Sequence, residues 1–126
     1  MSESNTAAAN STSRLAAFLD SRVSERMRRI VDFAIPHRPT FDLCCDHGLV
    51  GLWAWHVHSL SEVHFVDRAP GLVEALKARL AGRIALEGLS FHACDASEIE
   101  VSQSPSNVIV TGIGFRACQR IVSAID

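Results

Sequence analysis

The segment FDLCCDHGLVG, Phe41 to Gly51, places an acid, an imidazole and two glycines directly after an apolar run. Gly48 and Gly51 keep the GxxG half of a dinucleotide-type loop, in which missing side chains let the backbone approach a ligand and a helix approach a sheet. Asp46 stands where such a loop has its first glycine. A carboxylate there opposes a pyrophosphate and suits a cationic ligand. The segment therefore predicts a loop for a positively charged ligand.

Two further acids end apolar segments later in the chain. Asp67 ends EVHFVD and Asp95 ends LSFHACD. Ligands of an open parallel sheet lie beyond the carboxyl ends of its strands, where Asp67 would accept the hydroxyls of an adenosine ribose and Asp95 the adenine amino group. S-adenosylmethionine combines this nucleoside with a sulfonium and an ammonium, so the three acids favour it. A small NAD-binding Rossmann module is the alternative, against which Asp46 counts.

The elements that position these residues follow from the apolar periodicity. A helical pattern runs from Arg14 to Ala34, with Ser24 as an N-cap for its second part. Strand and helix patterns then alternate, which predicts a parallel sheet with helices on both faces. We expect an α/β Rossmann-like fold of about four parallel strands with an N-terminal helical segment. The expected strands are 41–45, 62–67, 89–95 and 106–114, and the expected helices are 49–57, 70–84 and 115–125.

Composition bounds the class of protein. At 126 residues with 48% apolar and 21% charged residues, one globular domain over 14–126 is expected, after a disordered polar tail at 1–13. No apolar run is long enough for a membrane span, and the N-terminus lacks the pattern of a signal peptide. The four cysteines form no CxxC pair. We therefore expect reduced thiols, no metal site and a cytoplasmic protein.

These segments resemble the bacterial tRNA adenine-22 N1-methyltransferases, a class I S-adenosylmethionine-dependent family. DLCCDHG, at 42–48, is similar to the family's Asp-Ile-Gly-Ser-Asp-His motif. RMRRIVDFAIP, VHFVDRAPGLVEAL and VIVTGIGFRACQRIV resemble its amphipathic helix, its second strand with the ribose-binding Asp, and its Gly-rich strand and following helix. The likeness covers about residues 22–125. Cys44 replaces a loop glycine, and Phe115 stands where a second glycine is expected.

The resemblance implies a cofactor site and an adenine in tRNA as substrate. It implies that the methionine part contacts Asp42, Asp46, His47 and Gly48, the ribose Asp67 and Arg68, and the adenine Asp95 and Ala96. Cys44, in the same loop, is also expected to bind the cofactor. It implies that Gly112, Ile113 and Gly114 face the target base. Because a ring nitrogen attacks with its own lone pair, no compulsory base is expected. Asp46 and His47 are the candidates for steering a proton.

The partners stay open at the level of the sequence. The arginines on the N-terminal helix are candidates for RNA contacts, although such a group is most often the wet side of a helix. The resemblance covers only the cofactor-binding half of the family's fold. The alternatives are therefore a non-catalytic cofactor-binding remnant that acts as an interaction or regulatory module, and a homodimer or partner chain that supplies the other half. The four arginines are Arg22, Arg26, Arg28 and Arg29.

Overall fold

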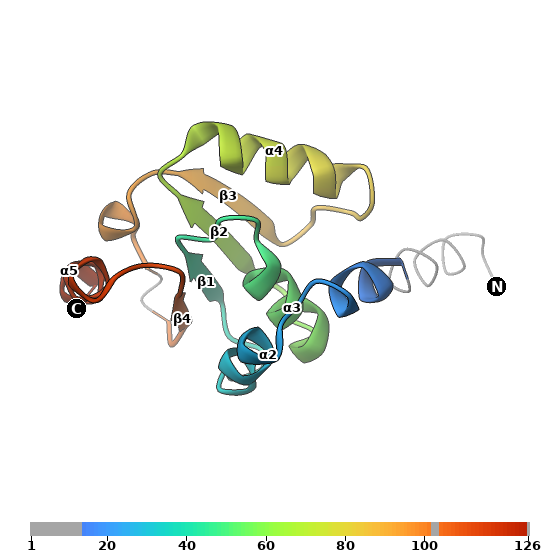
Figure 1. Ribbon diagram of the computed structural model, residues 1–126, viewed down its shortest axis with the longest axis horizontal. Helices are drawn as coiled ribbons and strands as arrows, with labels where there is room; N and C mark the ends of the chain where they lie inside the picture. The colour runs from blue at the N-terminus through green and yellow to red at the C-terminus, as the bar shows by residue number, and fades with distance from the viewer. Residues whose placement is uncertain (1–13, 102–103, 126) are drawn as a thin grey trace.

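The computed structural model describes residues 14–101 and 104–125, which form one α/β unit (Figure 1). Residues 14–20 are helical. The predicted disordered tail at 1–13 lies outside the described residues. The other elements are α2 (Glu25–Asp32), β1 (Thr40–Leu43), α3 (Leu49–His58), β2 (Val63–Asp67), α4 (Pro70–Ala81), β3 (Leu89–Ala93), the 3₁₀ helix η1 (Ala96–Glu98), β4 (Asn107–Val110) and α5 (Phe115–Ile125).

The four strands form one parallel sheet in the order β3-β2-β1-β4. Chain order therefore reverses at β1, since β2 pairs with one edge of β1 and β4 with the other. A reversal of this kind leaves a crevice beyond the carboxyl ends of the two central neighbours, which is where open α/β sheets bind ligands. The predicted fold class and the predicted alternation of strands and helices are confirmed.

Helices cover both faces of the sheet (Figure 1). One hydrophobic cluster joins α2, α3 and α4 to one face, with Phe65 and Leu76 fully buried in it. A second cluster joins α5 to the other face, with Leu43 and Ile121 at its centre. Because β1 is sandwiched between the two clusters, all four of its residues are buried, as expected for a central parallel strand.

Local signals explain where the helices begin. The Ser24 side chain accepts a hydrogen bond from Met27 N at 3.2 Å, so Ser24 is the N-cap of α2 as predicted. Pro70 occupies the first turn of α4, where its fixed φ and missing N–H cost nothing. Among the described residues, no helix is long and apolar enough to cross a membrane.

Some predicted boundaries were too long. β1 ends at Leu43 instead of Cys45, because Cys44 turns into the left-handed region with φ 60°. β3 ends at Ala93, and Asp95 instead caps η1. β4 ends at Val110, ahead of a turn at Gly112 with φ 72°. The predicted helix 70–84 ends at Ala81, where Gly82 becomes its C-cap.

Candidate ligand-binding site

The loop between β1 and α3 turns sharply because alternate residues adopt left-handed backbone. Cys44, Asp46 and Gly48 have φ of 60°, 50° and 75°. Only glycine adopts this region freely, so a cysteine there costs roughly 1–2 kcal/mol. Cys45 N donates to Val66 O at 2.9 Å and Gly48 N donates to Cys45 O at 2.7 Å, which fixes the loop against β2.

Asp67 ties the loop to the end of β2. One of its carboxylate oxygens, Oδ2, accepts from Asp46 N at 3.1 Å, and the other, Oδ1, accepts from Ala69 N at 3.0 Å. A carboxylate has about four lone-pair sites. Both oxygens of Asp67 therefore keep capacity for a ligand after they have set the loop and the start of α4.

Asp95 is held at the end of β3 by its own turn. Its Oδ1 accepts from Ser97 N at 2.9 Å, from Ser97 Oγ at 2.7 Å and from Arg120 Nη1 at 3.3 Å. The two bonds from Ser97, followed by Arg120, lower the pKa of Asp95 to about 2. Asp95 is therefore ionised at neutral pH, and its Oδ2 makes none of these bonds.

A cavity of about 500 Å³ opens between these loops, a volume within the range of small-molecule sites. Most of the residues predicted for the site line it, so strand ends that lie far apart in the sequence meet in one place. Those that line it are Cys44, Asp46, His47, Asp67, Arg68, Asp95, Ala96, Gly112 and Ile113.

Three other predicted site residues do not line the cavity. Gly114 precedes α5, where its carbonyl accepts from Cys118 N at 3.0 Å. Gly48 faces α4, and a Cβ there would lie 2.8 Å from Leu76 Cδ2. Asp42 is 1% exposed beneath the loop, and its Oδ2 accepts from Gly51 N at 2.9 Å. Gly48 and Asp42 thus hold the loop through contacts on the side away from the cavity.

Asp42 is a buried acid whose pKa is raised. Its Oδ1 has no hydrogen-bond partner within the described part of the chain. Burial raises the pKa of Asp42 to about 7, against the opposing effect of the Gly51 N–H, and the nearby Asp67 carboxylate raises it further. A protonated Oδ1 carries no charge, so near neutral pH the desolvation cost of this group is reduced.

The two adjacent cysteines are neutral thiols. Burial raises the pKa of Cys44 first, and Asp67 and other nearby carboxylates add to the effect. Burial likewise raises the pKa of Cys45 strongly. Thiolates are the nucleophilic form of cysteine. These residues therefore shape the cavity without offering a nucleophile, and all four cysteines of the chain are free.

The α2 helix contributes a wall that the sequence did not reveal. Ser24, Arg26, Met27 and Ile30 line the cavity opposite the strand ends. Periodicity identified the helix but not its docking over the loop, which depends on long-range packing of Val31 and Met27 in the core. From the β4 side, the unpredicted lining residues are Thr111, Ala117, Arg120 and Ile121.

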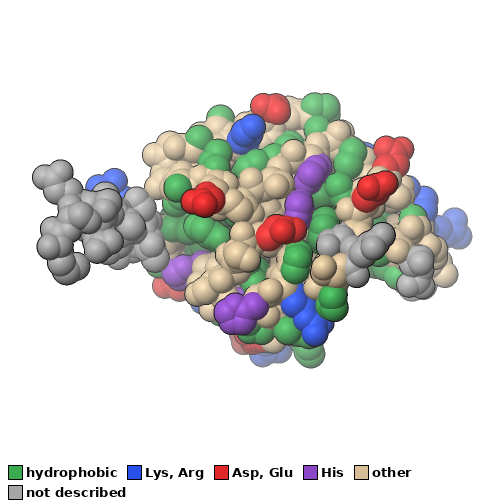
Figure 2. Space-filling view, turned by 180° about the vertical axis from the view of Figure 1, so that it is seen from behind, with side chains coloured by type: hydrophobic (Ala, Val, Ile, Leu, Met, Phe, Trp, Pro, Cys, Tyr) green, Lys and Arg blue, Asp and Glu red, His purple; other side chains and the backbone are tan. Residues whose placement is uncertain are grey.

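Three of the four candidate RNA-contacting arginines have partners within the chain. The Arg28 guanidinium bonds Asp20 at 2.9 Å and lies 4.3 Å from the ring centroid of Trp53. Arg29 bonds Glu25 at 2.9 Å, and Arg22 lies over the ring of Phe18 at 4.1 Å. Arg26 instead lines the cavity. On the face shown in Figure 2, charged side chains of both signs are scattered and form no single basic patch.

Comparison with known proteins agrees with this fold. A family model described as a methyltransferase domain matches residues 23–126. The chain therefore belongs to that methyltransferase family. A search of the curated proteins finds no match to the sequence.

Solved structures of RNA methyltransferases share the fold. The B. subtilis m1A22 tRNA methyltransferase TrmK has a TM-score of 0.68 at 15% identity, over 82% of this chain and 44% of its own. M. capricolum TrmK, solved with S-adenosyl-homocysteine, has a TM-score of 0.68 at 9% identity, over 80% of this chain and 46% of its own. The 23S rRNA methyltransferase ErmE has a TM-score of 0.66 at 19% identity, over 82% of this chain and 41% of its own. The chain thus spans less than half of each, and the fold resemblance predicted from the motifs is confirmed.

Proposed function

We propose that this chain binds S-adenosylmethionine in the 500 Å³ cavity and serves methyl transfer to a ring nitrogen of adenine in tRNA. The observation that carries the proposal is the convergence of Asp46, Asp67 and Asp95 on one cavity in a chain of the methyltransferase family. When bound, the cofactor would supply a methyl group on a positively charged sulfur.

The donor set of the cavity fits the cofactor. Asp46 offers a carboxylate to the ammonium, Asp67 offers lone pairs to the ribose hydroxyls, and Asp95 offers Oδ2 to the adenine amino group. Arg26, on the opposite wall, suits the methionine carboxylate, since a guanidinium matches a carboxylate in two hydrogen bonds. The cavity thus offers a carboxylate to the ammonium and a guanidinium to the carboxylate of a zwitterionic amino acid.

The pyrophosphate of NAD fits these residues less well. Asp46 lies at the loop where a dinucleotide places its phosphates, and like charges there repel. Asp67 alone would suit either ribose. The balance of charges therefore favours S-adenosylmethionine over a dinucleotide.

The substrate assignment is supported by the family resemblance and by the solved relatives. Gly112 and Ile113, after β4, line the cavity, and the resemblance puts the target base on their side. Two of the three solved structures named above are a tRNA methyltransferase and an rRNA methyltransferase. Methyl transfer to a ring nitrogen needs chiefly alignment of the lone pair. His47 and Asp46 lie at this site with Nε2 and Oδ1 3.8 Å apart, and their part in steering a proton stays a prediction.

Calorimetric titration of the chain tests the cofactor. We expect micromolar binding of S-adenosylmethionine and S-adenosylhomocysteine, about −8 kcal/mol, and none of NAD. 5′-Methylthioadenosine, which lacks the amino-acid part, should bind more weakly to the wild-type chain. Binding of NAD, or failure of the first two ligands to bind a folded chain, would overturn the proposal.

Arg26→Gln sharpens the same titration. Loss of a charge-assisted pair should weaken S-adenosylmethionine about 10- to 100-fold and leave 5′-methylthioadenosine unchanged. Arg29→Gln is the matched control, because Arg29 comes from the same helix, bonds Glu25 and does not line the cavity. Equal losses for both nucleosides in Arg26→Gln would remove Arg26 from the carboxylate site.

Transfer of a labelled methyl group to tRNA separates catalysis from binding. Transfer that is lost steeply with added salt would support the RNA substrate, since phosphate contacts release counterions. Cofactor binding without transfer to any RNA would instead favour the non-catalytic interaction module.

A further inference from the structure

A closed polar bridge joins η1 to α5 at one wall of the cavity. Arg120 Nη1 donates to Asp95 Oδ1 at 3.3 Å and to Ser97 Oγ at 3.2 Å, and Ser97 Oγ donates to the same Oδ1 at 2.7 Å. Each of the three side chains therefore contacts the other two. Asp95 and Arg120 line the cavity, whereas Ser97 does not. Residues of two elements thus hold one carboxylate of the cavity wall.

The bonds of the bridge to Asp95 all reach one of its two oxygens. Its Oδ1 also accepts from Ser97 N at 2.9 Å, which makes three bonds to that atom. The terminal torsion of an aspartate is otherwise broad, and the side chain of Asp95 is 29% exposed, so burial alone does not fix it. Rotation of the carboxylate would break the three bonds together. The bridge therefore holds Oδ2 in one direction as a hydrogen-bond acceptor.

We propose that Ser97 and Arg120 are positioning residues that make the cavity selective for a 6-aminopurine, an inference that rests on the proposed function. An ionised carboxylate only accepts hydrogen bonds. The 6-amino group of adenine donates to it, whereas the 6-carbonyl of hypoxanthine presents lone pairs at the same place and is repelled. A carboxylate held by three bonds does not turn away from that carbonyl. It therefore discriminates between the two bases more strongly than a freely rotating carboxylate does.

Ser97 and Arg120 contribute unequally to the bridge. Arg120 is 53% exposed, and an ion pair that is open to solvent contributes little through its charge. Loss of its guanidinium leaves Asp95 with both bonds from Ser97, which are the shorter ones. Loss of the Ser97 hydroxyl leaves Asp95 with the backbone bond and the long bond from Arg120, which has then lost its second acceptor. Ser97 is therefore the more important of the two.

Calorimetric titration with a matched pair of ligands tests this selectivity. S-Adenosylhomocysteine and S-inosylhomocysteine share the ribose and the amino acid and differ in the base, where a 6-carbonyl and an N1–H replace the 6-amino group. We expect the wild-type chain to prefer the adenosine compound about 10- to 100-fold. Ser97→Ala should reduce this preference about 5- to 10-fold, and Arg120→Gln should reduce it about 3-fold.

Two further variants separate positioning from a general loosening of η1 or α5. Ser97→Thr keeps the hydroxyl and should restore the wild-type preference. Arg116→Gln is the control for Arg120→Gln, because Arg116 lies one turn earlier on α5 and does not line the cavity. Circular dichroism establishes that each variant is folded. A purely structural role would weaken both ligands equally and leave their ratio unchanged.

The bridge also has a readout that needs no ligand. Donors to a carboxylate favour its charged form, so the pKa of Asp95 should rise from about 2 toward 3.8 in Ser97→Ala when its carboxyl carbon is followed by NMR. A wild-type chain that binds both ligands alike, or folded variants with the wild-type preference, would overturn the positioning role and leave the cofactor assignment standing. A folded wild-type chain that binds neither ligand would overturn the proposed function and this inference with it.

Discussion

The carboxylate of Asp67, at the end of β2, accepts a hydrogen bond from the backbone N–H of Asp46 at 3.1 Å. The bond joins two loops that both line the cavity. The loop thus uses the backbone of Asp46, and not its carboxylate, to bond Asp67. The position of the loop depends on the Asp67 carboxylate, whereas the charge offered to a ligand depends on the Asp46 side chain. Substitutions at the two residues can distinguish these contributions.

Asp67→Ala should lose both ligand affinity and loop order. The substitution removes the acceptor of Asp46 N and Ala69 N, and losing a hydrogen bond outside the core typically costs about 0.5–1.5 kcal/mol of unfolding free energy. Asp46→Asn should keep that free energy, because its backbone N–H still donates, and should weaken S-adenosylmethionine binding. Urea unfolding and calorimetry on the two variants measure this split. Unchanged affinity in Asp67→Ala would remove Asp67 from the site.

Asp42 should make stability depend on pH. Its pKa is about 7 in the folded chain against 3.8 for the ordinary group, so the folded state holds its proton where the unfolded state has released it. Its contribution to stability is therefore complete below about pH 4 and is lost as the pH rises toward 7.

Asp42→Asn isolates this effect, since it cannot titrate. The unfolding free energy of wild type minus that of Asp42→Asn should fall between pH 4 and 7, by up to about 1.4 kcal/mol per pH unit, and level off above pH 7. Urea unfolding at successive pH values measures it. A difference that is flat, or that rises with pH, would contradict a raised pKa.

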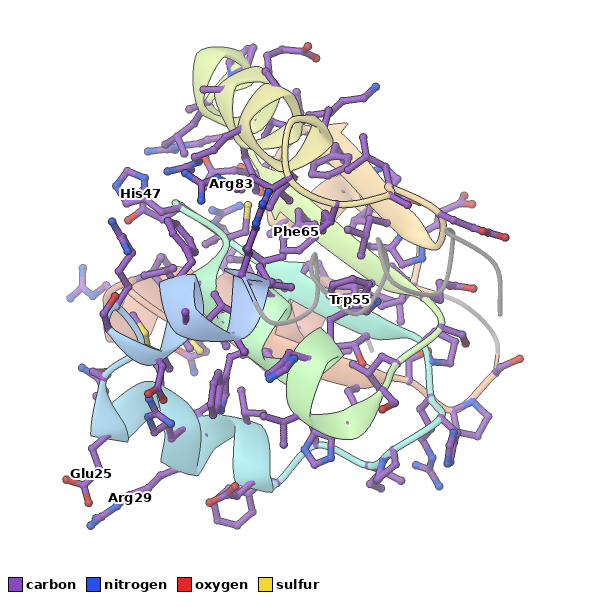
Figure 3. The ribbon with its side chains drawn as sticks, turned by 90° about the vertical axis from the view of Figure 1, so that its right-hand side faces the viewer. Glu25, Arg29, His47, Trp55, Phe65 and Arg83 are labelled. Atoms are coloured by element: carbon purple, nitrogen blue, oxygen red, sulfur yellow. The ribbon has the colours of Figure 1, made fainter. Side chains whose placement is uncertain are left out.

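Gly51→Ala should destabilise the fold. An added Cβ would lie 2.7 Å from Phe65 Cε1 and 2.8 Å from Asp42 Oδ2, and overpacking of this kind typically costs about 1–3 kcal/mol. Phe65 is fully buried between the sheet and its helices, so it has little room to move (Figure 3).

Gly71→Ala is the matched control for Gly51→Ala. It is also helical, and an added Cβ meets nothing within 4 Å. Because alanine favours a helix over glycine by up to about 1 kcal/mol, thermal unfolding should show Gly71→Ala as stable as wild type or more so. Equal melting temperatures for the Gly51 and Gly71 variants would refute close packing at Gly51.

The sequence by itself determined the class of fold and most of the cavity. Apolar runs that end in Asp67 and Asp95, and the glycine spacing after Asp46, follow from local rules for strands and loops. The carboxyl ends of parallel strands lie at one edge of the sheet. The predicted alternation of strands and helices therefore brings these acids together. The predicted end of β1 was wrong, because Cys44 adopts a left-handed backbone that its residue type does not indicate.

Only the tertiary structure decided what lies opposite those strand ends. Arg26 looked like one of four surface arginines, but α2 places it, still exposed, at the wall of the cavity. Asp42 looked like a ligand contact, but the register of β1 buries it beneath Gly51. Both outcomes depend on contacts between residues distant in the chain. A periodic pattern gives the face that an element buries, and packing alone decides which other element it meets.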